Sequence, residues 1–148
     1  MISQRDYSKS NIGQELPHLE YIFHPRSIAV VGASSDPNNW GMRNFVIPLM
    51  ESGYEGGVYP INPKYDEIMG LKTYPSIAEV PGPINHVICC ISAPLTPQLM
   101  RECVTKGVEV VTVSSAGFSE TGEEVEAKLE QELVEIALRA YGMESAPS

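Results

Sequence analysis

The chain alternates short runs of β-branched and apolar residues with segments of helical periodicity, from Ser27 into its last quarter. Such alternation is typical of βαβ units, in which parallel strands are joined by helices that cover both faces of one sheet. The expected strands are Ile28–Val31, Val58–Ile61, Val87–Ile91 and Val110–Val113. The sequence therefore predicts an α/β fold with a doubly wound parallel sheet and helices on both faces.

Helices are expected between and after these strands, each with one apolar face. The residues at helical spacing are, in chain order, Met42, Phe45, Val46, Leu49 and Met50, then Leu99, Met100, Cys103 and Val104, and finally Val125, Leu129, Leu133, Ile136, Ala137 and Ala140. Pro48 interrupts the first pattern, so a kink or an irregular turn is expected there. Thr96 is expected to cap the second helix, with Pro97 in its first turn.

At 148 residues with 43% hydrophobic content, the chain has the size of one domain. Residues 1–20 are expected to form a flexible N-terminal arm, residues 21–143 the domain, and residues 144–148 a polar C-terminal tail. A right-handed series of this kind would return to the sheet as a fifth strand after Gly142, yet the remaining residues are too few and too polar to form one. Either the chain is a piece of a longer protein, or the N-terminal segment or a second copy completes the sheet.

Charge and cysteine content argue against several classes of partner and site. Nineteen acidic against ten basic residues give a formal net charge of -9, which disfavours binding to nucleic acid and to anionic membranes. The three cysteines show neither a disulfide framework nor zinc-ligand spacing, and the N-terminus lacks the apolar core of a signal peptide. No catalytic or metal-binding group is expected, and a reducing cytoplasm is the expected location.

Ligands of doubly wound sheets bind beyond the carboxyl ends of the strands, where the strand order reverses. The loops that follow the expected strands are rich in small, polar or proline residues: Gly32–Gly41, Asn62–Tyr65, Ser92–Pro94 and Ser114–Phe118. The last of these has small side chains that would let a ligand approach the backbone, or it is a simple turn before an acidic helix.

The loop Gly32–Gly41 opens like a phosphate-binding turn but lacks the closely spaced glycines of the G-x-G-x-x-G motif. Backbone N–H groups at the start of the following helix, with the hydroxyl groups of Ser34 and Ser35, are candidates to hold a phosphate. The alternative is a strand-to-helix connection that binds no ligand. Trp40 is either a hydrophobic plug or a surface on which a base stacks.

The second expected strand ends in Asn62-Pro63-Lys64. A fold that binds NAD carries an Asp or Glu at this position to bind the ribose hydroxyl groups. An amide followed by a rigid proline and a cation indicates instead a nucleotide with an additional phosphate, which Lys64 would meet as a point charge. The alternative is that Lys64 is an ordinary surface lysine.

The stretches that contain these loops resemble a known family, the NDP-forming acyl-CoA synthetases, which are relatives of the succinyl-CoA synthetase alpha subunit. The resemblance is to their N-terminal CoA-binding domain and extends from about Tyr21 to Met143. It is carried by Pro25-Arg-Ser-Ile-Ala-Val-Val-Gly-Ala-Ser, Tyr59-Pro-Ile-Asn-Pro-Lys-Tyr, Ile91-Ser-Ala-Pro and Ser115-Ala-Gly-Phe-Ser-Glu. It implies a Rossmann-like fold that holds coenzyme A across the strand ends. One departure is Asn85-His86, where the family often has an acidic residue before its third strand.

The resemblance also implies a role for each loop. The residues that would line the nucleotide part of coenzyme A are Gly32, Ala33, Ser34, Ser35, Asn39 and Trp40. Lys64 would neutralise a CoA phosphate, while Asn62 and Pro63 would shape its loop. The residues that would border the ligand are Ser92, Ala93 and Pro94, and those toward the pantetheine and its thiol are Ser115, Ala116 and Gly117.

Complete enzymes of this family form an acyl-CoA from a carboxylic acid, CoA and a nucleoside triphosphate, through an acyl phosphate and a phosphorylated histidine. That histidine and the nucleotide-binding module belong to later domains, so this chain is not expected to catalyse the reaction alone. The implied partners are CoA or acyl-CoA and the remaining synthetase domains or subunits, with a homo-oligomer as a further option. The alternatives are an NAD(P)-binding oxidoreductase domain, in which Lys64 meets a 2′-phosphate, and a stand-alone CoA-binding regulatory protein.

Overall fold

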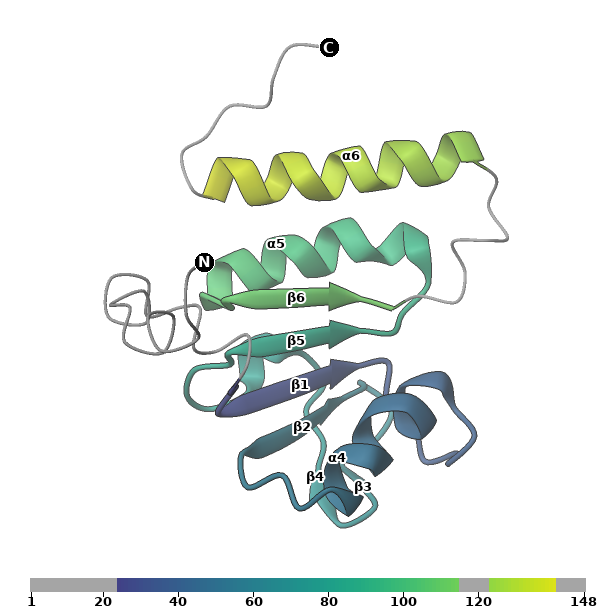
Figure 1. Cartoon of the computed structure of the whole chain (residues 1–148), viewed down its shortest axis with the longest axis vertical. Helices are drawn as coiled ribbons and strands as arrows, with labels where there is room; N and C mark the ends of the chain where they lie inside the picture. Colours follow the sequence, from purple (N-terminus) through teal and green to yellow (C-terminus); the bar gives the residue numbers. More distant parts are fainter. Residues whose placement is uncertain (1–23, 115–122, 141–148) are drawn as a thin grey trace, which may run out of the picture.

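The computed structural model describes residues 24–114 and 123–140. Within them, four strands form one parallel sheet in the order β2-β1-β5-β6 (Figure 1). The strands are β1 (Ser27–Val31), β2 (Gly57–Ile61), β5 (His86–Cys89) and β6 (Val110–Val113). All the predicted strands are confirmed, although β5 ends at Cys89 rather than Ile91, because the chain turns there into the next loop. The predicted N-terminal arm and C-terminal tail lie outside the described residues.

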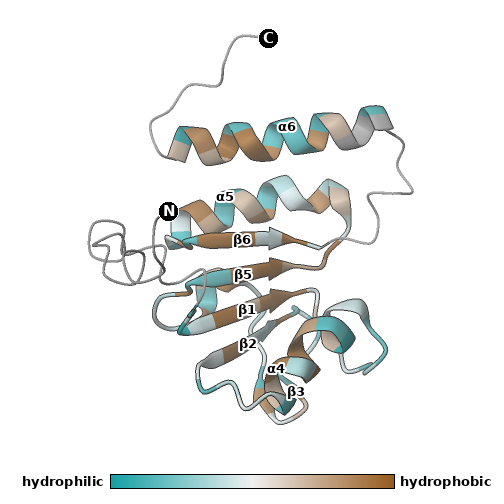
Figure 2. Ribbon diagram, viewed as in Figure 1, coloured by the Kyte–Doolittle hydropathy of each residue, from teal (hydrophilic) through white to brown (hydrophobic). Residues whose placement is uncertain are grey.

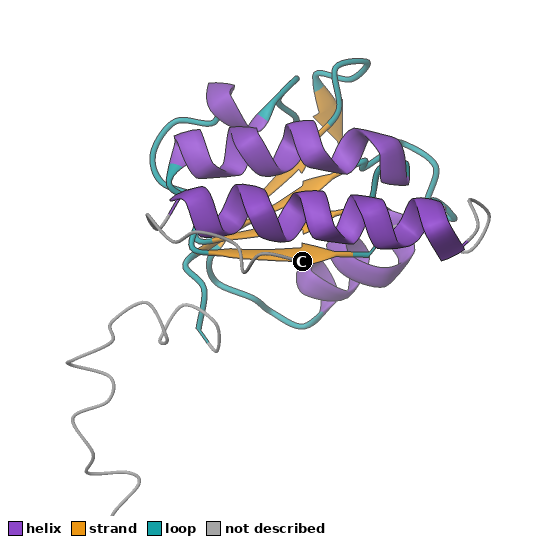
Figure 3. Cartoon of the chain, turned by 90° about the horizontal axis from the view of Figure 1, so that it is seen from above, coloured by secondary structure: helices purple, strands orange, loops and turns teal. Residues whose placement is uncertain are grey.

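Helices cover both faces of this sheet, as predicted (Figure 3). The π-helix η2 (Met42–Val46) continues into α4 (Ile47–Glu51) on one face, and α5 (Thr96–Lys106) lies on the other. The last helix, α6 (Glu123–Ala140), lies beside α5 at the β6 edge. The smaller elements are the hairpin of β3 (Glu67–Ile68) and β4 (Leu71–Lys72) and the 3-10 helices η3 (Ile77–Glu79) and η4 (Ala93–Leu95).

The sheet separates two apolar cores, and the central strands carry the strongly hydrophobic residues that fill them (Figure 2). Successive residues of β1 point to opposite faces, so Ala29 faces the α5 core and Val30 faces the η2 core. Because both faces are covered, all five residues of β1 are buried. The neighbours Cys89 and Cys90 also divide between the two cores.

Pro48 produces the predicted irregularity in the first helix. The N–H of Ile47 donates to the carbonyl oxygen of Met42, five residues back, and this widens the turn just before the proline. A proline has no N–H and crowds the preceding turn of a regular helix, so a wider turn accommodates it. Around this turn Ile47 joins Phe45, Val46 and Leu49 against the core, whereas Met50, expected on that face, is 40% exposed.

The start of α5 also differs from the prediction. Thr96 is the first helical residue instead of the cap, because η4 leads directly into the helix with no extended residue between them. The buried Thr96 hydroxyl group donates to the carbonyl oxygen of Ala93 at 2.6 Å. Leu99 and Cys103 are buried as predicted. Val104 is 41% exposed, because it borders a groove beside α6.

At the amino ends of the strands, one buried amide joins three of them. The Asn85 Oδ1 accepts a hydrogen bond from the backbone N–H of Arg26 at 2.8 Å, and its Nδ2 donates to the Glu109 carboxylate at 3.2 Å. The backbone N–H of Asn85 donates to the hydroxyl group of Ser27 at 2.9 Å. An acidic side chain here would accept the first bond but could not donate the second, so the amide suits this position.

Gly32 allows the loop after β1 to cross closely over the end of β5. Its φ is +98°, and a Cβ added there would lie 2.6 Å from the carbonyl oxygen of Cys90. Its N–H donates to the carbonyl oxygen of Ile61 at 3.1 Å, which extends the pairing of β1 with β2. The position therefore needs both the left-handed backbone and the missing side chain of glycine.

We expect Gly32→Ala to lower the free energy of unfolding by about 3 kcal/mol, because backbone strain and the clash with Cys90 add. Gly107→Ala is the matched control, since its φ is +81° but nothing lies within 4 Å of the added Cβ. Only the strain remains there, and it costs about 1 kcal/mol. Urea denaturation followed by circular dichroism measures both changes, and equal losses would contradict the close contact at Gly32.

Candidate functional site

The strand order places the switch point between β1 and β5. From β1 the chain crosses through η2 and α4 to β2, and from β5 it crosses through α5 on the other face to β6. Ligands of doubly wound sheets bind beyond the carboxyl ends of the strands at such a point. The strands of Figure 1 all point toward one edge of the molecule, so the predicted loops lie together there.

The loop after β1 satisfies several of its own hydrogen-bond donors. The N–H of Asp36 donates to the Ser34 hydroxyl group at 3.1 Å. The Oδ1 of Asn39 accepts from the N–H groups of Gly41 and Met42 at 3.0 and 3.2 Å. The N–H groups at the helix start were candidates to bind a phosphate. These two donate to the Asn39 side chain instead. Asn39, expected to line a ligand, therefore caps the helical turn that begins at Trp40 and leads into η2.

The side chain of Asn62 joins the loops after β1 and β2. Its Nδ2 donates to the carbonyl oxygen of Ala33 at 2.8 Å, and its Oδ1 accepts from the N–H of Lys64 at 2.9 Å. The N–H of Asn62 donates to the carbonyl oxygen of Tyr74 at 3.0 Å. One amide thus sets the backbone of Lys64 relative to that of Ala33, while Pro63 and the Lys64 side chain are exposed to solvent.

Tyr65, which the sequence analysis did not single out, belongs to the same cluster. Hydrogen bonds from the side chains of Ser35 and Ser34 and from the backbone N–H of Ser35, with the charge of Lys64, lower the pKa of the Tyr65 phenol. Three hydroxyl groups from two loops therefore lie together, and the exposed Lys64 directly precedes Tyr65 in the chain, so the donors here suit a phosphate. The sequence contains one indication of this role, because Tyr65 directly follows the candidate residue Lys64.

The loop after β5 forms another wall of this edge. Ser92 and Pro94 are exposed, while Ala93 is buried at the start of η4. A cavity of roughly 230 Å³ lies between the residues that precede Asn62 and Ser92. Its apolar lining includes Val31, Ile61, Pro75, Ile77, Ile91 and Leu95. Such a recess suits a flat, largely apolar group beside the polar cluster.

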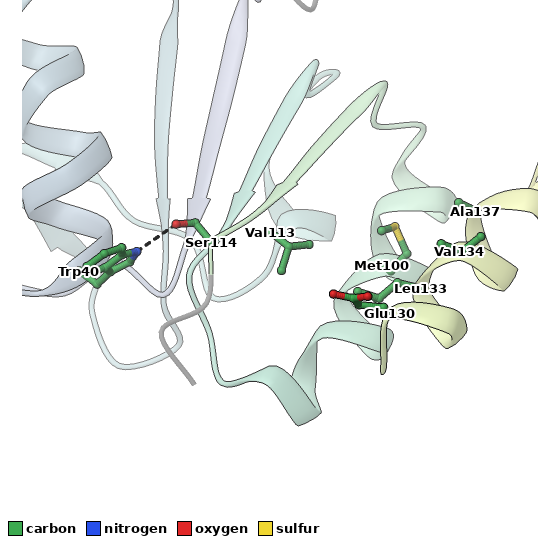
Figure 4. Close-up of a pocket in the computed structure, with 8 residues that line it drawn as sticks. All are labelled: Trp40, Met100, Val113, Ser114, Glu130, Leu133, Val134 and Ala137. Carbon is green, nitrogen blue, oxygen red and sulfur yellow. Dashed lines mark hydrogen bonds between the residues drawn. The ribbon is translucent and has the colours of Figure 1, made fainter. Parts of the chain in front are cut away.

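Trp40 reaches across the strand ends to the loop after β6. Its indole Nε1–H donates to the Ser114 hydroxyl group at 3.0 Å (Figure 4). The ring is 49% exposed and lines an apolar cavity of roughly 610 Å³ together with Val113. Trp40 therefore fixes the end of its loop over the sheet and keeps part of its ring accessible. The predicted residues that follow Ser114 lie outside the described part of the chain: Ser115, Ala116 and Gly117.

Within residues 24–114 and 123–140, no group of three or more His, Cys, Asp or Glu side chains is placed to hold a metal ion. Burial raises the pKa of Cys90 and that of Cys103 to about 12, so both thiols stay protonated at neutral pH and are poor nucleophiles. No helix in the same part of the chain has both the length and the apolar character to cross a membrane.

The sequence is similar to a CoA-binding domain family and to ligases that act on coenzyme A according to their descriptions. A family model described as a CoA binding domain matches residues 26–145. The chain is 45% identical over 132 residues to the alpha subunit of an ADP-forming acetate–CoA ligase I from Pyrococcus furiosus, covering 84% of this chain and 27% of that protein. It is 40% identical over 131 residues to an ADP-forming acetate–CoA ligase II from Archaeoglobus fulgidus, covering 86% of this chain and 19% of that protein.

A solved structure shows the same fold. The apo form of a dinucleotide forming acetyl-coenzyme A synthetase 1 from Ca. Korarchaeum cryptofilum matches 84% of this chain and 26% of its own, with 40% identity and a TM-score of 0.75. The chain thus spans roughly a quarter or less of the length of these relatives. It matches their N-terminal part.

We expect the Tyr65 phenol to ionise below the usual value of 10.0, because hydrogen bonds from Ser35 and Ser34 stabilise the phenolate. The difference in phenolate absorbance between the unchanged chain and Tyr65→Phe, followed as pH rises, isolates this titration. Ser35→Ala should move it to higher pH. Tyr54→Phe is the matched control, because burial raises the pKa of Tyr54 and its titration should lie above 10.0. A Tyr65 titration at or above that of Tyr54 would contradict the cluster.

Proposed function

This chain belongs to the CoA-binding domain family, and from that premise we propose that the carboxyl edge of its sheet binds coenzyme A. The observation that carries the proposal is the Asn62 amide, which holds the backbone of Lys64 against Ala33 where an NAD-binding fold carries an acid. A cation held there favours a nucleotide with a phosphate beyond those of its diphosphate bridge. Coenzyme A has such a phosphate, on the 3′ position of its ribose.

The polar cluster would hold this phosphate. Lys64 would pair with its charge, and the hydroxyl groups of Ser34, Ser35 and Tyr65 would donate to its remaining oxygen atoms. Asn62 would keep the two loops at the separation that the phosphate requires. Binding therefore depends on groups from two loops that a single side chain joins.

The remaining walls would take the less polar parts of the ligand. The apolar recess beside Ser92–Pro94 would hold the adenine base, since such a recess excludes water from a flat ring. Gly32 and Ala33 would let the diphosphate approach the backbone. Trp40 would border the other end, where Ser114 leads into the residues expected near the pantetheine thiol.

In the whole protein, this domain would serve as the CoA-binding part of an NDP-forming acyl-CoA synthetase. It would present the CoA thiol to an acyl group that other domains or subunits activate, and it would supply no catalytic group itself. These domains are the partners that the proposal requires, because the chain spans roughly a quarter or less of its relatives. Binding of CoA or acyl-CoA without synthetase activity is therefore expected of the 148-residue chain.

Calorimetric titration with CoA tests the proposal. The unchanged chain should bind, and Lys64→Ala should weaken binding by roughly tenfold or more, because hydrogen bonds to charged groups contribute about 1.5–3 kcal/mol. Dephospho-CoA, which lacks the 3′-phosphate, should bind the unchanged chain as weakly as CoA binds Lys64→Ala. Lys64→Ala should not weaken the binding of dephospho-CoA further.

Lys128→Ala is the matched control, because it removes the same charge from an exposed position on α6. Its affinity for CoA should stay within about twofold of the unchanged chain. Equal losses in the two variants would mean that Lys64 acts only through net charge. No binding at millimolar CoA would refute the proposal, and binding of NADPH without CoA would favour the oxidoreductase alternative.

A further inference from the structure

The recess that is proposed for adenine has polar side chains in its lining as well as apolar ones. Ser76 comes from the segment that leads into η3, while Gln98 and Glu102 come from α5. The apolar lining can contact the face of any planar ring, since such contact does not depend on the substituents at the edge of the ring. The base that binds in the recess is therefore selected by the polar side chains, because bases differ in the donors and acceptors along their edges.

Gln98 and Glu102 lie one turn apart on the same face of α5, because residues at this spacing in a helix are neighbours. The chain has the same pair of residue types at the same spacing in α6, where the Nε2 of Gln131 donates to the Glu135 carboxylate at 3.4 Å. Gln98 and Glu102, by contrast, form no hydrogen bond with each other, although both lie in the described part of the chain. Their polar atoms are therefore available to a molecule in the recess.

The hydroxyl group of Ser76 is available in the same way. A serine before a helix usually accepts a hydrogen bond on its hydroxyl oxygen from an N–H of the first turn, but the side chain of Ser76 forms no such bond with η3. The N–H of Glu79 donates instead to the backbone carbonyl oxygen of Ser76 at 3.2 Å. Among residues 24–114 and 123–140, no partner forms a hydrogen bond or an ion pair with the side chain of Ser76, Gln98 or Glu102.

The charge of Glu102 limits the kinds of ligand that the recess accepts. A carboxylate accepts hydrogen bonds but donates none, so a ligand must offer it a donor. The side chain is partly buried, and burial of a carboxylate without a partner is unfavourable. Because the whole chain has a formal net charge of -9, a further negative charge beside a phosphorylated ligand weakens binding unless that ligand also donates to it. The recess therefore favours a base that carries an amino group.

The edge of adenine that carries its amino group matches the two side chains of α5. The amino group donates hydrogen bonds, and the ring nitrogen beside it accepts one. Glu102 would accept from the amino group, and the amide of Gln98, which has both a donor and an acceptor, would donate to the ring nitrogen. Guanine carries a carbonyl oxygen in place of this amino group, and a carboxylate repels that oxygen.

We infer that Gln98 and Glu102 recognise the amino edge of adenine and that Ser76 donates to a further ring nitrogen, so that the recess selects adenine nucleotides. The apolar lining would supply affinity for the ring, and these side chains would supply the specificity. The identity of the nucleotide as coenzyme A rests on the proposed function, whereas the recess and its unpaired polar side chains do not.

Calorimetric titration with CoA and with its etheno derivative tests the inference. In the derivative, an added ring joins the amino group to the neighbouring ring nitrogen, so the base loses that donor and that acceptor. The unchanged chain should bind etheno-CoA roughly tenfold more weakly than CoA, because hydrogen bonds to charged groups are the stronger ones. Glu102→Ala should bind CoA roughly tenfold more weakly than the unchanged chain does, and its preference for CoA over etheno-CoA should be smaller. An undiminished preference in Glu102→Ala would overturn the inference, because the added ring would then only collide with the wall.

Two further variants separate recognition of the base from net charge. If Glu102 acted only through its charge, its removal would strengthen the binding of an anionic ligand, so tighter CoA binding by Glu102→Ala would overturn the inference. Glu102→Gln keeps an acceptor oxygen and should bind CoA with an affinity between those of Glu102→Ala and the unchanged chain. Glu135→Ala is the matched control, because Glu135 has the same spacing from a glutamine but lies on α6. It should change the preference for CoA over etheno-CoA by less than about twofold.

Gln98→Ala tests the second contact. It should weaken the binding of CoA by roughly threefold, because a neutral hydrogen bond contributes less than one to a charged group. Gln131→Ala makes the matched change on α6 and should leave the affinity for CoA within about twofold of that of the unchanged chain. Equal losses in these two variants would overturn the assignment of Gln98.

Adenosine and purine riboside separate this inference from the proposed function. Neither carries a phosphate, and purine riboside differs from adenosine only in lacking the amino group. In an NMR titration the unchanged chain should bind adenosine more tightly, and Glu102→Ala should abolish that preference. This result without CoA binding would support recognition of adenine and refute the CoA site. Binding of CoA that depends on Lys64 but shows no preference over etheno-CoA would do the reverse, and tighter binding of guanosine than of adenosine would overturn the inference.

Discussion

Burial of β1 between two helical layers is the constraint on which the rest of the structure depends. Its five residues are buried, and they pair with β2 on one side and with β5 on the other. The parallel register aligns Val31 with Ile61 and with Cys89, so the chain leaves three strands at the same level. The loops that carry Lys64, Ser92 and the serines after β1 therefore all begin at the same edge of the sheet.

Much of this arrangement follows from the sequence. The apolar runs and their spacing predicted the strands, the two helical layers and the edge at which the loops meet, because burial on both faces leaves a clear pattern. Pro48 predicted irregular geometry but not the π turn, and so not the exchange of Met50 for Ile47 on the apolar face. The direction of that shift depends on the hydrogen bond that the backbone forms around the proline, which no pattern of side chains encodes.

The polar contacts were harder to predict than the apolar ones. Asn62 contacts Ala33, which lies 29 residues earlier, and Asn85 contacts Arg26, which lies 59 residues earlier. Such partners are known only once the strand register is known. The part of Tyr65 in this cluster was not predicted for the same reason, because its hydrogen-bond partners are serines on another loop. The two asparagines act at opposite ends of the sheet. Asn85 forms hydrogen bonds that connect strands at their amino ends, and Asn62 forms hydrogen bonds that connect loops at their carboxyl ends.

Asn39 also affects which groups contribute positive electrostatic potential at this edge. Many phosphate sites draw it from the first N–H groups of a helix. Here the Asn39 amide oxygen faces those of Gly41 and Met42, and the exposed Lys64 is the cation of the polar cluster. The chain as a whole carries a formal net charge of -9. An anionic ligand would thus be repelled at long range and attracted only near contact, so its capture would depend on direct collision with this edge rather than on electrostatic steering.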